Sequence, residues 1–141
     1  MILVDTGPLI SLLNNKDPHH NSCVEIFNHL PEQLLITTWP CFTEAMYLLS
    51  SVGGFHFVSK LWKLYHNRVV ILHDLSSYEI NRKAVLMEKY HDTPMDLAEA
   101  SLIAMAESYS FTQIFTLDSD FNIYRLENGA ALELLPKQRS I

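Results

Sequence analysis

Cysteine is scarce in this chain, and the two that occur, Cys23 and Cys41, lie far apart. They have neither the close pairing of a zinc knuckle nor the density of a disulfide scaffold, so we expect reduced, buried thiols. No apolar run approaches the roughly 18 to 20 residues of a membrane-spanning helix, and Asp5 interrupts the N-terminus before a signal-peptide core is complete. These absences predict a cytoplasmic protein without a membrane segment.

Positive charge is also in short supply. Ten Lys and Arg residues stand against sixteen Asp and Glu, which gives a formal net charge of -6 at pH 7. This balance argues against a protein that wraps nucleic acid over a broad basic face. It does not exclude a nuclease, because acids that hold a divalent metal make the net charge negative. The seven histidines lack the helical H-x-x-x-H spacing of a metal site, and we expect most of them in loops or on the surface.

The overall composition is that of an ordinary globular protein, with 48% hydrophobic and 18% charged residues. We find no internal repeat and no stretch typical of a linker or a disordered tail. A length of 141 residues suits one domain that buries roughly two thirds of its unfolded surface. We therefore predict a single domain over residues 1–141.

Short aliphatic and β-branched runs alternate with helical patterns along the chain. They predict strands at residues 2–4, 34–37, 69–72, 114–117 and 131–135. Apolar residues at helical spacing predict helices over residues 8–13, 20–30, 40–53, 58–65, 76–90 and 94–109, with a short segment at 121–125. This alternation predicts an α/β fold with a mostly parallel sheet of about five strands and helices on both faces.

Acidic residues recur where these elements begin or end. Asp5 follows the first strand, Asp118 and Asp120 follow the fourth, Asp96 lies at the start of an apolar helix, and Glu44 lies on a mostly apolar one. Ligands of open parallel sheets bind beyond the carboxyl ends of the strands, so these acids can converge there. Converging carboxylates repel one another unless a divalent cation neutralises them, and oxygen ligands suit Mg²⁺ or Mn²⁺.

Each acid also has a purely structural interpretation. Asp5 can cap the first helix, Asp118 can close a turn, and Glu44 can be a solvated helix residue. Asp96 can occupy the third position of a helix that Thr93 caps. Only the set as a whole favours a metal site, whose chemistry would be the activation of a water for attack on phosphorus.

Four motifs occur in a fixed order along nearly the whole chain. They are Val4-Asp5-Thr6, Glu44, Pro94-Met95-Asp96-Leu97-Ala98-Glu99-Ala100-Ser101-Leu102 and Thr116-Leu117-Asp118-Ser119-Asp120-Phe121. In this order and spacing they resemble the PIN domain family, specifically the VapC-type toxins of toxin–antitoxin pairs. No single motif is specific by itself.

The resemblance implies a PIN-like three-layer fold and a ribonuclease that depends on Mg²⁺ or Mn²⁺. It implies that the catalytic, metal-binding acids are Asp5, Glu44, Asp96 and Asp118, with Asp120 as an auxiliary metal ligand. Thr6 would be a small polar neighbour of the metal, and Thr116 would position the substrate phosphate or a water. Close relatives often have an aspartate where this chain has Glu99, which shares the Asp96 face at i, i+3 spacing and can still reach the site.

The resemblance also implies partners. We expect an RNA substrate, either transfer, ribosomal or messenger RNA, a homodimer, and a cognate antitoxin whose C-terminal segment lies in a groove between the first helices. Apolar candidates for that groove are Leu9, Leu12, Leu13, Phe55, Phe57 and Trp62. Arg125 follows the acidic loop, and we expect it to contact the substrate phosphate.

Two alternatives belong to other functional classes. Asp5-Thr6-Gly7 after an aliphatic run also resembles the aspartic protease signature, although that fold is all-β and this chain has several helical patterns. A PIN-like fold without catalysis, acting as a binding module, is the second alternative. Cleavage of peptide at acid pH despite a chelator would favour the first, and Mn²⁺ binding without RNA cleavage would favour the second.

Overall fold

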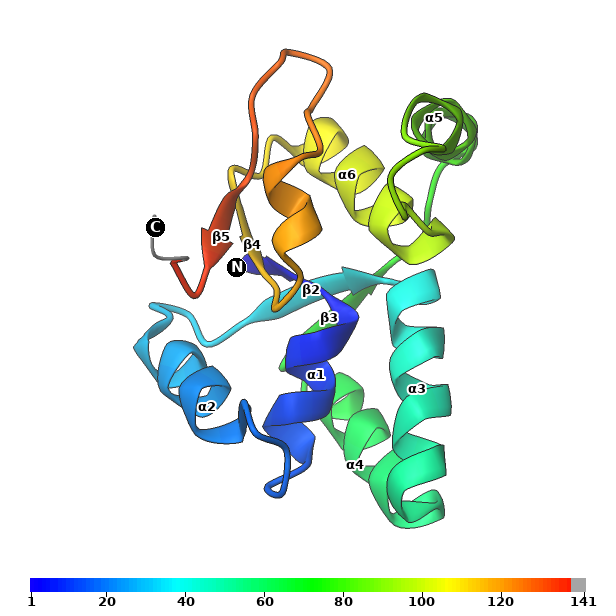
Figure 1. The fold of residues 1–141 in the computed structure, drawn as a ribbon. Helices are drawn as coiled ribbons and strands as arrows, with labels where there is room; N and C mark the ends of the chain where they lie inside the picture. Colours follow the sequence, from blue (N-terminus) through cyan, green and yellow to red (C-terminus); the bar gives the residue numbers. More distant parts are fainter. Residues whose placement is uncertain (138–141) are drawn as a thin grey trace.

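The computed structural model describes residues 1–137, so the last four residues of the predicted domain lie outside it. Strands and helices alternate along this range (Figure 1). The strands are β1 (Ile2–Val4), β2 (Leu35–Thr38), β3 (Val70–His73), β4 (Gln113–Phe115) and β5 (Glu133–Leu135). The helices are α1 (Thr6–Leu13), α2 (His20–His29), α3 (Trp39–Gly53), α4 (Phe55–His66), α5 (Ser77–Lys89), α6 (Leu97–Tyr109) and the 3₁₀ helix η1 (Ser119–Asn122).

The five strands form one sheet in the order β3-β2-β1-β4-β5, and every neighbouring pair is parallel. The chain leaves β1 for β2 and β3 on one side and later returns to β4 and β5 on the other. β1 and β4 therefore meet at the point where the strand order reverses, with Val4 beside Phe115. In open parallel sheets this switch point is where a crevice opens beyond the carboxyl ends of the strands. The predicted five-stranded α/β sheet is confirmed.

Helices cover both faces of the sheet, as predicted, with α1 to α4 on one side and α5 and α6 on the other (Figure 1). Successive strand residues point to opposite faces, which divides the core in two. Leu3, Ile36 and Ile114 pack into the cluster that α5 and α6 cover. Val4 and Phe115 pack into the cluster beneath α1 to α4. Because both of its faces are buried, the central strand β1 is apolar throughout rather than alternating.

Three α-helix starts differ from the prediction by more than one residue, and one of them is that of α4, which begins at Phe55 rather than at residue 58. α1 begins at Thr6 rather than Pro8, because the Asp5 side chain accepts a hydrogen bond from the Thr6 N–H and caps the helix two residues earlier. α6 begins at Leu97 rather than Pro94, and its N-cap is Asp96, not Thr93. Residues 91–94 form a turn instead, so the capping signal three residues further along determines where the helix begins.

The expectations for the cysteines and most histidines hold. Cys23 and Cys41 are free and buried, and five of the seven histidines are exposed. Among residues 1–137, no helix is both long enough and apolar enough to cross a membrane. The cytoplasmic location itself remains a prediction.

Candidate metal centre

A cavity of about 430 Å³ opens at the carboxyl edge of the sheet, beside the switch point between β1 and β4. Five acidic side chains line it: Asp5, Glu44, Asp96, Glu99 and Asp118. They come from the end of β1, from α3, from the start of α6 and from the segment after β4. The fold thus brings together the four acids predicted to be catalytic, as well as Glu99.

Asp5 is the most deeply buried of the four predicted catalytic acids, at 8% exposure. One carboxylate oxygen accepts a hydrogen bond from the Thr6 N–H at 2.8 Å, and the other accepts one from the Thr116 hydroxyl at 2.7 Å. Burial raises the pKa of Asp5 to about 6, and the charges of Asp118 and Asp96 act in the same direction. The structure therefore holds this carboxylate rigidly in a place where its charge is costly.

A chain of local hydrogen bonds positions the acids after β4. The Asp118 N–H donates to the Thr116 hydroxyl at 3.0 Å, and the Asp120 N–H donates to the Asp118 carboxylate at 2.9 Å, which caps η1. The hydroxyl of the buried Thr116 thus links the Asp5 carboxylate to the backbone N–H of Asp118 and holds the two residues close to each other. Asp120 is half-buried, and burial together with the charge of Asp118 raises its pKa.

Glu99 lies on the first turn of α6 and forms a reciprocal capping box with Asp96. The Glu99 N–H donates to Asp96 at 2.8 Å, and the Asp96 N–H donates to Glu99 at 3.1 Å. Glu99 is only 9% exposed and also accepts a hydrogen bond from the Tyr124 hydroxyl at 2.8 Å. Burial raises its pKa well above the ordinary value, although the bond from Tyr124 lowers it. No motif indicated Tyr124, whereas the Asp-x-x-Glu spacing is a recognisable capping signal.

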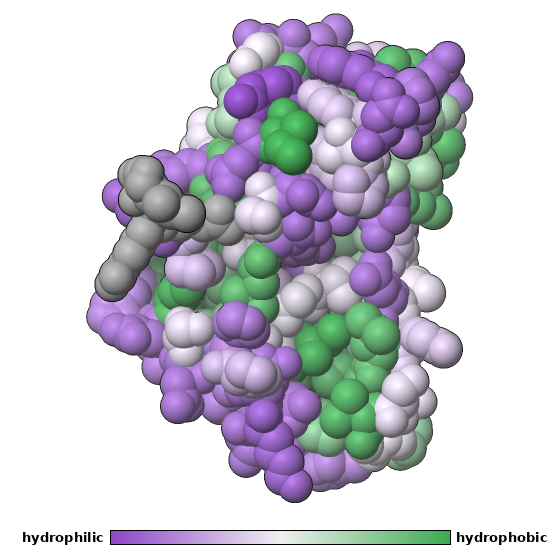
Figure 2. All heavy atoms as spheres, in the orientation of Figure 1, coloured by the Kyte–Doolittle hydropathy of each residue, from purple (hydrophilic) through white to green (hydrophobic). Residues whose placement is uncertain are grey.

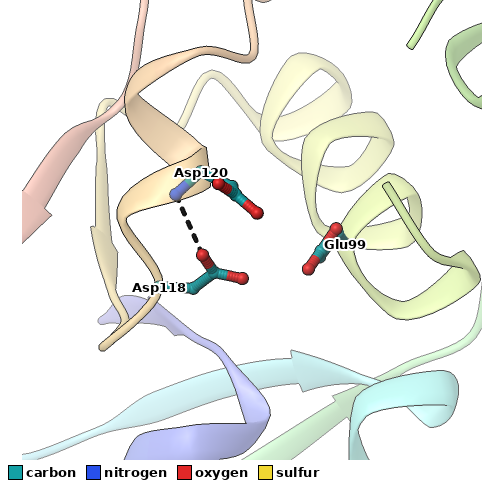
Figure 3. A group of neighbouring side chains, drawn as sticks. All are labelled: Glu99, Asp118 and Asp120. Carbon is teal, nitrogen blue, oxygen red and sulfur yellow. Dashed lines mark hydrogen bonds between the residues drawn. The ribbon is translucent and has the colours of Figure 1, made fainter. Parts of the chain in front are cut away.

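Glu99, Asp118 and Asp120 form the tightest acidic cluster in residues 1–137. Each offers one carboxylate oxygen, and these oxygens lie within 4.8 Å of one another. Figure 3 shows Glu99 on α6 lying across from the two aspartates of the β4–η1 segment. The sequence had already suggested Asp118 and Asp120 as ligands, and the geometry adds Glu99 to them.

Glu44 reaches the cavity from the middle of α3, where it is half-buried. Burial raises its pKa, and the charges of Asp96 and Asp5 add to the effect. Thr6 lines the same cavity, and its hydroxyl donates to the Cys41 carbonyl. Both residues therefore lie where the sequence predicted a metal site.

Arg125 lies apart from these acids. Its guanidinium donates to the backbone carbonyls of residues 122, 123 and 124 at the end of η1, and Arg125 is not among the residues that line the cavity. The role predicted for it, a phosphate contact, remains a prediction. In the described part of the chain, no Lys, Arg or His forms an ion pair with any acid of the cavity.

The chemistry of this donor set fits a hard divalent cation. Carboxylate oxygens are the ligands that Mg²⁺ and Mn²⁺ prefer, and a few carboxylates suffice to hold Mg²⁺ beside phosphate groups. Like charges crowded in a cavity raise each other's pKa values, as Asp5 and Glu44 show. A divalent ion would remove that repulsion, so these residues can hold one.

The fold and the acidic cavity define a class of protein, a small α/β domain with carboxylates gathered at its topological switch point. The model of one family, the PIN domain, matches residues 2–126. The chain therefore belongs to the PIN domain family.

One curated relative is Ribonuclease VapC26 of Mycobacterium tuberculosis. It is 22% identical over 136 residues, an alignment that spans 96% of this chain and 100% of VapC26. The likeness thus extends over nearly the whole of this chain and the whole of VapC26.

Solved structures share the fold. VapC20 of Mycobacterium tuberculosis, described as a sarcin-ricin loop cleaving toxin, has a TM-score of 0.80 at 17% identity, with 87% of this chain and 94% of VapC20 covered. VapBC2 of Rickettsia felis, bound to a DNA fragment from its promoter, has a TM-score of 0.65 at 13% identity, with 95% and 98% covered. A toxin–antitoxin complex from Klebsiella pneumoniae has a TM-score of 0.63 at 18% identity, with 86% and 90% covered.

Proposed function

We propose that this chain is a metal-dependent endoribonuclease of the VapC type, which hydrolyses RNA phosphodiester bonds at the acidic cavity. The observation that carries the proposal is the convergence of acids from four segments on one cavity without a single Lys or Arg among its lining residues. The match of the PIN domain model and the likeness to Ribonuclease VapC26 support the same conclusion. Mg²⁺ and Mn²⁺ both suit the donor set.

Some residues of the cavity would bind the ion, and others position the residues that bind it. Glu99, Asp118 and Asp120 would hold a divalent ion, together with the other acids that line the cavity, Asp5, Glu44 and Asp96. A bound divalent ion would supply a water of lowered pKa and neutralise charge that develops on the phosphate. Thr116 keeps Asp5 and Asp118 in place through its two hydrogen bonds. Such prior positioning matters because displacement of a catalytic group by about 1 Å costs roughly 100-fold in rate.

The fold contradicts the aspartic protease interpretation of Asp5-Thr6-Gly7. The described sheet is entirely parallel and has helices on both faces, whereas the protease fold is all-β. Asp5 also neighbours several further acids rather than a single proton-sharing partner. The activity test below distinguishes the nuclease from the catalytically silent binding module.

An antitoxin partner is supported by the apolar surface beside the cavity. Figure 2 shows apolar side chains gathered over α1 and α3, and Ile10 and Leu48 line the acidic cavity itself. The apolar and acidic surfaces are therefore continuous, which suits a segment that carries both apolar and basic side chains. Structural neighbours include toxin–antitoxin complexes. We extend this proposal to a homodimer, which light scattering of the purified protein tests.

The groove residues named from the sequence fall into three groups. Leu9 is fully buried in the core and cannot line a groove, which corrects that prediction. Phe55 is 78% exposed and, with Trp62, lines a depression of about 440 Å³ on α4. Leu12, Leu13 and Phe57 are partly buried against the core.

The test of the proposed function is cleavage of RNA by the purified chain with and without EDTA, beside the variant Asp96→Asn. Asparagine preserves the cap of α6 but removes the charge, so we expect activity to fall by about 100-fold or more. The matched control is Asp92→Asn, four residues earlier, whose side chain is 90% exposed. Full activity in EDTA, or of Asp96→Asn, would contradict the proposal, as would Mn²⁺ binding without cleavage of any RNA.

A further inference from the structure

Tyr124 is a buried tyrosine whose hydroxyl contacts Glu99, one residue of the acidic cluster. It follows η1 and is 1% exposed. Its ring packs edge-on against Tyr90, with ring centroids 5.1 Å apart, and against Phe121 at 5.4 Å. Rings on two sides hold the tyrosine in place, so the direction of its hydroxyl is fixed by the packing rather than by solvent.

The Tyr124 hydroxyl donates to one oxygen of Glu99, Oε2, at 2.8 Å. The same oxygen accepts a hydrogen bond from the Asp96 N–H at 3.1 Å. Two donors from different segments thus hold Oε2, and the Glu99 side chain lies across from Asp118 and Asp120 (Figure 3). A carboxylate held at one oxygen by two donors cannot rotate freely away from its neighbours.

We propose that Tyr124 is a positioning residue, which orients Glu99 as the third carboxylate, beside Asp118 and Asp120, around a divalent ion. The inference rests on the proposed function and adds a named role for Glu99 and Tyr124. Residues that hydrogen-bond a metal ligand without touching the metal commonly govern the metal affinity and the orientation of that ligand. A hydroxyl suits this task because it donates to the carboxylate without adding a positive charge that would compete with the ion.

The length of Glu99 is consistent with this role. Its side chain closes the capping box with Asp96 and at the same time reaches the Tyr124 hydroxyl. An aspartate at this position would be one methylene shorter, and the capping box is characteristic of Glu or Gln at the third helical position. The glutamate and the tyrosine therefore form a matched pair.

The experiment measures Mn²⁺ affinity by titration calorimetry for the native chain and for Tyr124→Phe, which removes one oxygen and keeps the ring. We expect the affinity to fall by about 10- to 100-fold. The matched control is Tyr90→Phe, in the same aromatic cluster, whose hydroxyl accepts a hydrogen bond from the Arg125 N–H and contacts no acid of the cavity. We expect its Mn²⁺ affinity to stay within about twofold of the native value, because the loss of an outer bond matters only where it orients a ligand.

A second comparison separates positioning from general structural support. If Tyr124 acts through Glu99, Tyr124→Phe has little further effect once Glu99→Gln is present, because coupled residues are not additive. In RNA cleavage we expect kcat to fall and KM to stay, since Tyr124 does not line the cavity. An unchanged Mn²⁺ affinity of Tyr124→Phe, or an equal loss with and without Glu99→Gln, would overturn the inference and leave the proposed function intact. Failure of the native chain to bind Mn²⁺ would overturn both.

Discussion

Replacement of Asp5 by Asn should stabilise the metal-free protein at neutral pH, although Asp5 belongs to the candidate metal centre. Burial raises the pKa of this carboxyl from 3.8 to about 6, which means that its ionised form is disfavoured in the folded state. A shift of about two pKa units corresponds to about 3 kcal/mol of unfolding free energy at pH 7. Asp5 is only 8% exposed, so solvent screens little of this cost.

The loss of a hydrogen bond in Asp5→Asn offsets part of this gain in unfolding free energy. The carbonyl oxygen of asparagine can still accept from the Thr6 N–H, and asparagine is as good an N-cap as aspartate. Its amide group cannot accept from the Thr116 hydroxyl, and the loss of that bond costs about 1 kcal/mol. The net stabilisation is therefore about 2 kcal/mol, which corresponds to a rise in melting temperature of roughly 6 °C for a domain of this size.

The assay is urea denaturation and thermal unfolding in EDTA at pH 7.5, with Asp92→Asn as the control for loss of one negative charge. That side chain is 90% exposed, so we expect its stability to match the native protein. Saturating Mn²⁺ should reverse the order, because an ion that binds only the folded native chain adds stability that Asp5→Asn cannot gain. If Asp5→Asn were less stable than the native protein in EDTA, the assignment of Asp5 as a strained, buried charge would be wrong.

Two further predictions concern the same carboxylates. The extra stability of Asp5→Asn in EDTA should shrink as the pH falls from about 6 towards 4. The reason is that Asp5 in the folded protein, with a pKa of about 6, takes up its proton at a higher pH than Asp5 in the unfolded chain. A stability difference that is constant over this pH range would contradict the raised pKa. Thr116→Val should lower Mn²⁺ affinity by about 10- to 100-fold, since it frees Asp5 and Asp118. The control Thr37→Val removes a buried hydroxyl that donates to the Val4 carbonyl, so calorimetry should show a loss of stability with unchanged Mn²⁺ affinity. Equal losses of Mn²⁺ affinity in Thr116→Val and Thr37→Val would refute the role of Thr116.

The strands and the gathering of the acids were predictable because they follow from local patterns. An apolar run without alternation indicates a strand buried on both faces, and such strands occur in parallel sheets flanked by helices. Once the sheet is parallel, Asp5 and Asp118 must lie at the same edge. Topology alone thus accounts for the meeting of residues that are more than a hundred positions apart in the chain.

The start of α6 could not be predicted with the same certainty, since two capping patterns overlap there. Thr93 and Asp96 have the spacing of one capping pair, and Asp96 and Glu99 have the spacing of another. In the structure only the second forms, with both reciprocal hydrogen bonds. Tyr124 was missed for a different reason, because its contact with Glu99 depends on how η1 packs against α6 and has no local signature.

The chain treats its buried carboxylates in two different ways. Glu107 forms a two-point ion pair with Arg82, at 2.8 and 3.0 Å. At Glu79 burial acts to raise the pKa, yet hydrogen bonds from the Ser76 N–H and His73 hold it below its ordinary value. Away from the cavity, then, these two carboxylates receive a compensating partner from the protein itself.

The cavity acids Asp5 and Glu99 receive hydrogen bonds too, but no Lys, Arg or His of the described residues forms an ion pair with an acid of the cavity. Asp5, Glu44 and Glu99 all have raised pKa values, with burial as the main cause. Acids left without cations would be an unexplained cost if they were only structural, because the same chain supplies partners elsewhere. The difference between the two kinds of carboxylate is therefore the physical argument behind the proposal that a divalent ion supplies the positive charge at the cavity.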